Sequence, residues 1–202
     1  HNLFLSLVLT MITCLILGMG IPTIPNYIIT SSLAGPALLE LGVPLIVSHM
    51  FVFYFGIMAD LTPPVALAAF AAAPMAKTSG MKIGVEATKL ASAGFVVPFM
   101  AVYTPALMLQ DPGAISAAWG YPVEVIYLFA KACFGIGLWG VAVVGFLFTR
   151  AAALERLIAL VAGASLVVAL PWTDELGWAL GIILVAQHWW RSRKLGAATV
   201  TP

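Results

Sequence analysis

Charged residues are scarce in this sequence. Lys, Arg, Asp and Glu make up 8% of the 202 residues, whereas soluble domains average about 25%. Together with a hydrophobic share of 62%, this excludes a soluble globular domain. The 9 basic and 8 acidic residues leave a net charge of +1, so the basic surplus of a nucleic-acid-binding protein is missing. The composition predicts an integral membrane protein, with room for roughly five to seven segments at about 20 residues per crossing.

Reactive motifs are lacking as well. The two cysteines, Cys14 and Cys133, lie in apolar runs without disulfide or metal-ligand spacing. No HExxH helix, Ser/Lys pair or close aspartate pair supports an intramembrane enzyme, and no GxxxxGK[ST] sequence supports ATP-driven transport. We therefore expect no enzyme activity and no organic cofactor. Because the chain begins at His1 inside an apolar run, without a basic leader or cleavage site, we interpret it as the C-terminal fragment of a longer protein.

The hydrophobic runs predict helices, because an isolated strand cannot satisfy its backbone in lipid. The predicted apolar blocks are Leu3–Ile21, Tyr27–Leu39, Leu45–Ala76, Leu90–Leu109, Val125–Thr149, Leu157–Leu170 and Leu176–Trp190.

Basic residues cluster in three of the connections, which the positive-inside rule assigns to the cytoplasm. These groups are Lys77, Lys82 and Lys89, then Arg150 and Arg156, then Arg191, Arg193 and Lys194. The intervening segments 111–124 and 173–175 contain acidic residues and no Lys or Arg, so they should face outward. The pattern predicts four crossings after residue 77, with a cytoplasmic C-terminus. Lys131 lies in one of these segments, and we expect its amine to extend toward the outer interface.

Two apolar stretches are interrupted by proline-containing clusters, GMGIPTIPN at 18–26 and DLTPP at 60–64. The prolines should leave the carbonyls of Gly18, Ile21, Ala59 and Asp60 without helical partners. Irregular backbone at membrane depth is tolerated where protein buries it or where it lines a polar cavity, and unwound carbonyls suit Na⁺. The two breaks therefore predict a site for a monovalent cation.

Several side chains at the breaks fit such a site. Gly18 and Gly20 allow close backbone approach, and Thr23, Asn26 and Thr62 supply hard oxygen ligands. Asp60 is an ionisable residue at a helix break and thus a functional candidate. The alternatives are that the prolines are packing kinks and that Asp60 caps the turn. The segment 3–39 could form a re-entrant hairpin or two full crossings; we favour the hairpin because its second arm has only 13 residues.

The amino-acid sequence of the interrupted region resembles that of a known family. GMGIPT at 18–23, the Pro25-Asn26 that follows, HMFVFYFGIMADLTPP at 49–64 and VALAAFAAA at 65–73 are similar to the large membrane subunit of tripartite ATP-independent periplasmic (TRAP) transporters. The segment FYFGIMAD before the prolines resembles the fused permeases of the TAXI branch. Ala66 departs from the glycine commonly found after TPPV. The resemblance covers roughly residues 18–109 and is weaker beyond residue 111.

This resemblance implies an all-α elevator-type transporter of the bacterial inner membrane, multi-pass and coupled to Na⁺. The chain would supply the second of two inverted repeats, a re-entrant hairpin and a discontinuous helix, followed by about four transmembrane helices. Its implied partners are a periplasmic substrate-binding protein, the N-terminal remainder of the permease and membrane lipid, with a small organic acid or amino acid as cargo. Carried over by motif, the sodium or substrate site comprises Gly18, Gly20, Thr23, Asn26, Gly56, Asp60, Thr62 and Pro63.

The resulting domain prediction places the C-terminal part of a transport domain at residues 1–110. It contains the hairpin 3–39, the broken helix 45–76, a connector at 77–89 with a solvated helix, and a helix at 90–109. Residues 111–202 would form a C-terminal membrane extension with a basic tail. The alternative function is a non-transporting membrane anchoring or assembly module, which residues 121–190 fit because they contain few polar intramembrane groups.

Overall fold

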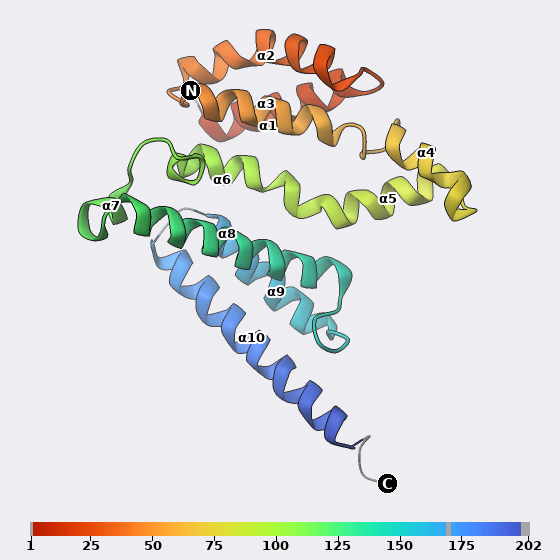
Figure 1. The fold of residues 1–202 in the computed structure, drawn as a ribbon, viewed down its shortest axis with the longest axis vertical. Coiled ribbons are helices and arrows are strands. Elements are labelled where there is room, and N and C mark those ends of the chain that lie inside the picture. The colour runs from red at the N-terminus through yellow and green to blue at the C-terminus, as the bar shows by residue number, and fades with distance from the viewer. Residues whose placement is uncertain (1, 169–170, 199–202) are drawn as a thin grey trace. The chain divides into compact units, whose positions relative to one another are not determined.

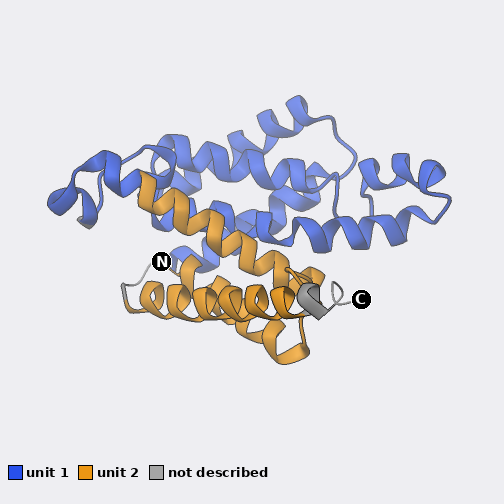
Figure 2. Ribbon diagram, turned by 60° about the horizontal axis from the view of Figure 1, so that its bottom comes forward, with its two compact units in different colours: residues 1–125 blue, residues 126–202 orange. Residues whose placement is uncertain are grey.

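A computed structural model describes residues 2–168 and 171–198. In these ranges the chain is helical and forms no strand, apart from an isolated bridge between Phe146 and Arg150. The predicted all-α membrane fold is confirmed. His1, the last two residues of the predicted block Leu157–Leu170, and the end of the tail at 199–202 lie outside the described residues. The chain divides into two compact units, 1–125 and 126–202, which are coloured separately in Figure 2.

Unit 1 begins with two helices joined by a short turn, where the hairpin is predicted. The second helix has 18 residues rather than the 13 expected, and the choice between re-entry and two full crossings stays a prediction. Helix α1 (Leu3–Gly18) starts where the Asn2 side chain accepts a hydrogen bond from the Leu5 amide at 3.4 Å, an N-cap. A turn at 19–22, with Gly20 at φ +79°, leads into α2 (Thr23–Glu40). A residue with a side chain would be strained at this φ, which explains the second glycine of GMGIPT.

The predicted helix 45–76 is broken near its middle. Helix α3 (Leu45–Met58) ends before the DLTPP cluster, and α4 (Leu67–Ala76) resumes after it. The intervening residues 59–66 are not α-helical and include the cis peptide Pro63–Pro64. Ala66 has φ +40°, so this position, where the resembling family commonly has glycine, lies in the conformation that glycine adopts most easily.

Helices α1, α2 and α3 pack together around a common apolar core, and α4 pairs with α5 (Gly80–Leu90) (Figure 1). The fully buried side chains of this core include Leu7, Leu38, Val47, Phe51 and Phe55. Phe51 and Phe55 stack edge-to-face with centroids 4.8 Å apart, and both contact Phe99 of α6 (Val97–Tyr103) in the same way. These aromatic contacts fix α3 within unit 1.

The rest of unit 1 is a series of shorter helices. They are α5 (Gly80–Leu90), the 3₁₀ turn η1 (Ala91–Phe95), α6 (Val97–Tyr103), η2 (Pro105–Met108) and α7 (Ala114–Trp119). The Ser79 side chain caps α5 by accepting from the Lys82 amide at 3.4 Å. Helix α5 covers most of the predicted connector, and Glu86 and Lys89 form an ion pair on it at 2.9 Å. The segment Gly80–Tyr103 is long and apolar enough to cross a membrane.

Unit 2 contains most of α8 (Tyr121–Val144), together with α9 (Ala153–Val167) and α10 (Pro171–Ala198). Helix α8 is the second segment long and apolar enough to span a membrane. The core of this unit comprises Leu138, Val141, Ala142, Ala159, Ala162, Leu166 and Leu184. The number of crossings and the cytoplasmic C-terminus stay predictions.

Candidate functional site

Three of the predicted site residues meet between the hairpin and the broken helix. A methyl group added at Gly18 would come 2.8 Å from the Gly56 carbonyl oxygen and 2.9 Å from Asn26 Nδ2. A methyl group added at Gly56 would come 2.8 Å from the same Nδ2. Both contacts are too short for a real side chain, so glycine at 18 and 56 is what lets the end of α1 and the end of α3 approach the Asn26 amide.

Asn26 occupies the centre of this cluster. It lies in the first turn of α2. Its backbone amide donates to the Pro22 carbonyl at 3.1 Å, and its backbone carbonyl accepts from Thr30 Oγ1 at 2.7 Å. The side chain is 3% exposed, and its Oδ1 atom is buried without a hydrogen-bond partner. Leaving such an oxygen unsatisfied costs about 1–3 kcal/mol. This oxygen is therefore available to a ligand that carries positive charge.

The backbone at the end of α3 also frees an oxygen. In a continuous helix the Asp60 amide would donate to the Gly56 carbonyl, but it donates to the Ile57 carbonyl at 3.1 Å. The next two amides, of Leu61 and Thr62, likewise shift by one residue and donate to the carbonyls three positions earlier. This shift from α-helical to 3₁₀ bonding releases the Gly56 carbonyl beside Asn26.

The carbonyls of Ala59 and Asp60 lack α-helical partners, as predicted, but both accept hydrogen bonds from other amides. The Ala59 carbonyl accepts from the Thr62 amide at 3.3 Å, and the Asp60 carbonyl accepts from the Ala68 amide at 3.2 Å. These two oxygens are therefore hydrogen-bonded rather than free, because the turn tightens and then folds back onto the start of α4. The released oxygen lies one turn earlier, at Gly56.

The other predicted site residues do not join the cluster through any contact in the described residues. Gly20 and Thr23 are exposed at the hairpin turn, and a methyl group at Gly20 would meet nothing within 4 Å. Thr62 is half-buried and donates its hydroxyl to the Met58 carbonyl at 2.7 Å, which leaves lone pairs on Oγ1. Asp60 is also half-buried.

Pro63 faces a different neighbour. A methyl group at Gly84 of α5 would come 3.2 Å from Pro63 Cγ, so this proline packs against the connector helix.

The donor set is oxygen-rich and uncharged. Amide, carbonyl and hydroxyl oxygens are hard ligands of the kind that alkali cations accept. In the described part of the chain no group of three His, Cys, Asp or Glu residues could hold a metal ion. The predicted cation fits this structure because Asn26 Oδ1 is buried and has no hydrogen-bond partner.

A polar pair that starts at the residue after Asn26 was not predicted. The Tyr27 hydroxyl lies 2.8 Å from His49 Nδ1 and thereby joins α2 to α3. The Tyr27 ring also meets Phe53 edge-to-face, with centroids 5.5 Å apart. The face shared by His49 and Phe53 follows from helical spacing, but the partner on the other helix could be found only from the packing of α2 on α3.

Unit 2 contains a buried ion pair. Lys131 Nζ of α8 contacts the Asp174 carboxylate of α10, and the two side chains are only 4% and 17% exposed. The Tyr127 hydroxyl donates to the same carboxylate at 3.1 Å. The Lys131 amine is thus buried against an acidic group in the segment 173–175, which the charge pattern predicts to face outward. Its extension toward the outer interface stays a prediction.

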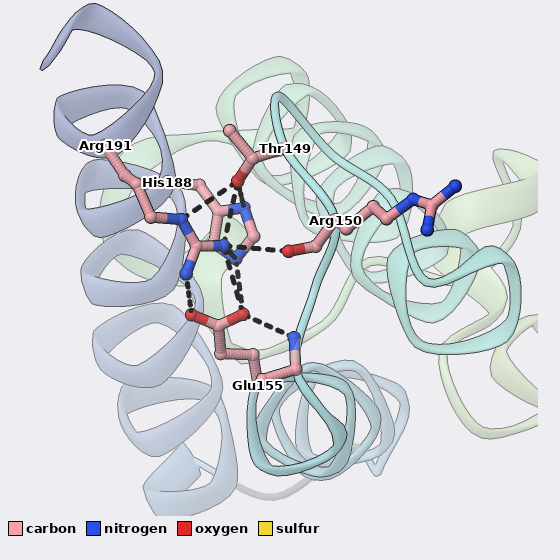
Figure 3. Close-up of polar contacts among 6 residues, drawn as sticks. Thr149, Arg150, Glu155, His188 and Arg191 are labelled. Atoms are coloured by element: carbon pink, nitrogen blue, oxygen red, sulfur yellow. Dashed lines mark hydrogen bonds and ion pairs between the residues drawn. The ribbon is translucent and has the colours of Figure 1, made fainter. Parts of the chain in front are cut away.

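A second polar network in unit 2 joins the start of α9 to α10 (Figure 3). The Arg191 guanidinium donates to the Glu155 carboxylate at 2.9 Å, and His188 Nε2 lies 3.1 Å from the same group. Arg191 also donates to Thr149 Oγ1 at 2.8 Å and to the Arg150 carbonyl at 2.9 Å. The Ala152 amide, then Arg191 and His188, lower the pKa of the Glu155 carboxyl.

Comparison with known proteins yields one match. A family model described as "Tripartite ATP-independent periplasmic transporter, DctM component" matches residues 1–112, more than half of the chain. Neither the curated proteins nor the solved structures yield a match. The matched range contains the hairpin, the broken helix and the Gly18–Asn26–Gly56 cluster.

Proposed function

The chain belongs to the DctM-component family of tripartite ATP-independent periplasmic transporters and is a transporter permease component of the inner membrane; we propose that it couples import of a small organic acid or amino acid to Na⁺. In this proposal a periplasmic binding protein delivers the cargo. The permease spans the membrane several times, and its C-terminus is cytoplasmic. We also propose that the permease belongs to the TAXI branch of this family, in which the small and large membrane subunits form one polypeptide.

One observation carries the proposal of sodium coupling. Asn26 Oδ1 is buried, without a hydrogen-bond partner, at the point where α1, α2 and α3 meet. A bound Na⁺ would be held by this oxygen and by the Gly56 carbonyl, with the Thr62 hydroxyl oxygen as a further candidate. The ion supplies positive charge, which replaces the missing hydrogen bonds of these oxygens.

The position of the cluster explains why ion binding would affect movement. Asn26 belongs to the second arm of the hairpin, Gly18 to the first, and Gly56 to the broken helix. A cation between them would hold three segments together that otherwise depend on close glycine contacts. We propose that the hairpin and the broken helix then move as one body, as in an elevator mechanism.

Uptake into proteoliposomes tests the coupling. The full permease that contains this chain is reconstituted with its binding protein, and uptake of labelled glutamate and succinate is measured with and without an inward Na⁺ gradient. We expect uptake that depends on the gradient. Equal uptake without the gradient would refute the coupling.

Site variants test the residues. Asn26→Ala and Thr62→Ala should each weaken the dependence of uptake on Na⁺ without altering membrane insertion. Thr13→Ala is a matched control for Thr62→Ala, because Thr13 Oγ1 also donates to the carbonyl four residues earlier, at 2.9 Å, but is exposed on α1. An unchanged Na⁺ titration in Asn26→Ala or Thr62→Ala would remove that residue from the site.

A further inference from the structure

Basic side chains outnumber acidic ones where the α8–α9 loop meets the end of α10. The charged residues of this end are Glu155 and the cations Arg150, Arg156, Arg191, Arg193 and Lys194. Glu155 pairs with Arg191. Arg156 donates instead to the carbonyls of Ala142 and Val143 at 2.8 and 3.0 Å and so caps the end of α8. In the described ranges no carboxylate pairs with the three cations that remain, Arg150, Arg193 and Lys194.

Two of the three free cations lie over exposed indole rings. Arg193 Cζ is 4.1 Å from the centroid of Trp189, and Lys194 Nζ is 5.6 Å from that of Trp190. The two tryptophans are 45% and 68% exposed. Cation–π contact holds each charge above its ring, and indoles favour the level of lipid headgroups. The apolar block of α10 ends at Trp190, so the rings and charges lie where a membrane segment would leave the hydrocarbon.

The third cation, Arg150, lies in a loop that is hydrogen-bonded to α10. Arg191 donates to the Arg150 carbonyl at 2.9 Å and to Thr149 Oγ1 at 2.8 Å. In Figure 3 the Arg150 side chain points away from this network. The loop backbone is thus fixed to α10, but the Arg150 guanidinium is directed away from that helix and does not join the pair formed by Arg193 and Lys194.

From this arrangement we propose that Arg193, Lys194 and the two indoles bind the headgroup of an anionic phospholipid. Phosphate accepts paired hydrogen bonds from guanidinium, and the exposed indole faces suit the interfacial part of the lipid. The charge complementarity is strong, because the one carboxylate at this end is already paired with Arg191. The positive-inside pattern predicts that the lipid belongs to the cytoplasmic leaflet.

Native mass spectrometry of the full permease tests this proposal. The purified protein is titrated with phosphatidylglycerol and, separately, with phosphatidylcholine, and the occupancy of bound lipid is measured. We expect saturable binding of phosphatidylglycerol only. A cation near a membrane surface contributes about fivefold in affinity, so Arg193→Gln with Lys194→Gln should weaken binding by about 25-fold.

The matched control is Lys77→Gln with Lys82→Gln, which removes two exposed cations from unit 1. It should change affinity less than twofold. An equal loss in this control, or no loss in the Arg193/Lys194 variant, would overturn the proposal. Competition by inorganic phosphate at the same concentration would also overturn it, because the site would then take free phosphate.

A quenching measurement on the unmodified protein does not depend on how the Gln variants fold. In bilayers, brominated phosphatidylglycerol should quench tryptophan fluorescence more than brominated phosphatidylcholine at the same mole fraction, and Trp189→Phe with Trp190→Phe should abolish the difference. Equal quenching by the two lipids would contradict a headgroup site at these rings.

Discussion

The ion pair between Lys131 and Asp174 predicts a large and specific loss of stability. Lys131→Met removes the amine and leaves the Asp174 carboxylate, which is 17% exposed, with the Tyr127 hydroxyl as its remaining partner. Removing one member of a buried pair costs about 3–5 kcal/mol. Because Asp174 keeps one hydrogen bond and some exposure, we expect the lower end, about 3 kcal/mol.

Two further variants separate the pair from general effects of the substitution. Lys131→Met combined with Asp174→Asn should recover about 2 kcal/mol, because no buried charge remains. Lys89→Met is the matched control, since its partner Glu86 is 2.9 Å away but the two side chains are 55% and 61% exposed. That loss should be about 0.2–0.5 kcal/mol.

Reversible unfolding of the purified permease in mixed micelles, titrated with dodecyl sulfate, measures all three variants. The reasoning is refuted if Lys131→Met costs no more than Lys89→Met, or if the double variant is no more stable than Lys131→Met alone.

Three other outcomes follow from the contacts. Gly18→Ala brings a methyl group 2.8 Å from the Gly56 carbonyl, so we expect a loss of about 1–3 kcal/mol in the same unfolding assay; a neutral variant would contradict the close approach. Tyr27→Phe removes the bond to His49 and should cost about 1 kcal/mol, and no loss would show that the bond is absent. The folded pKa of Glu155 lies below its ordinary value of 4.5, so its contribution to stability is present above that value and is lost as pH falls through the folded pKa. Glu155→Gln should abolish this acid-dependent part, and an unchanged pH profile would argue against it.

The hairpin and the helix break could be predicted because proline and glycine act locally. A proline cannot donate to the preceding turn, and Gly20 permits the φ of +79° that the turn requires. The carbonyl that is released could not be predicted in the same way. Its position depends on whether the amides after Met58 donate to carbonyls three or four residues earlier. They donate three residues earlier, and this releases the Gly56 carbonyl.

The selection among candidate side chains also required the fold. Thr23 and Asn26 are both predicted from the sequence as oxygen ligands beside the break. In the structure only Asn26 is buried against Gly18 and Gly56. The pairs in unit 2 are harder still, because Tyr127 and Asp174 are 47 positions apart and Glu155 and Arg191 are 36 apart. Such contacts follow from helix packing, which hydrophobic periodicity does not determine.

Equilibrium binding of ²²Na⁺ to the purified permease, without cargo, tests the proposed cation site most directly. The unmodified protein should bind Na⁺ saturably in the presence of excess K⁺, and Asn26→Ala should lose this binding while remaining folded. Asn2→Ala removes the same amide from the exposed cap of α1 and should bind normally. Saturable binding that survives in Asn26→Ala would contradict the assignment of Asn26 Oδ1 as a sodium ligand.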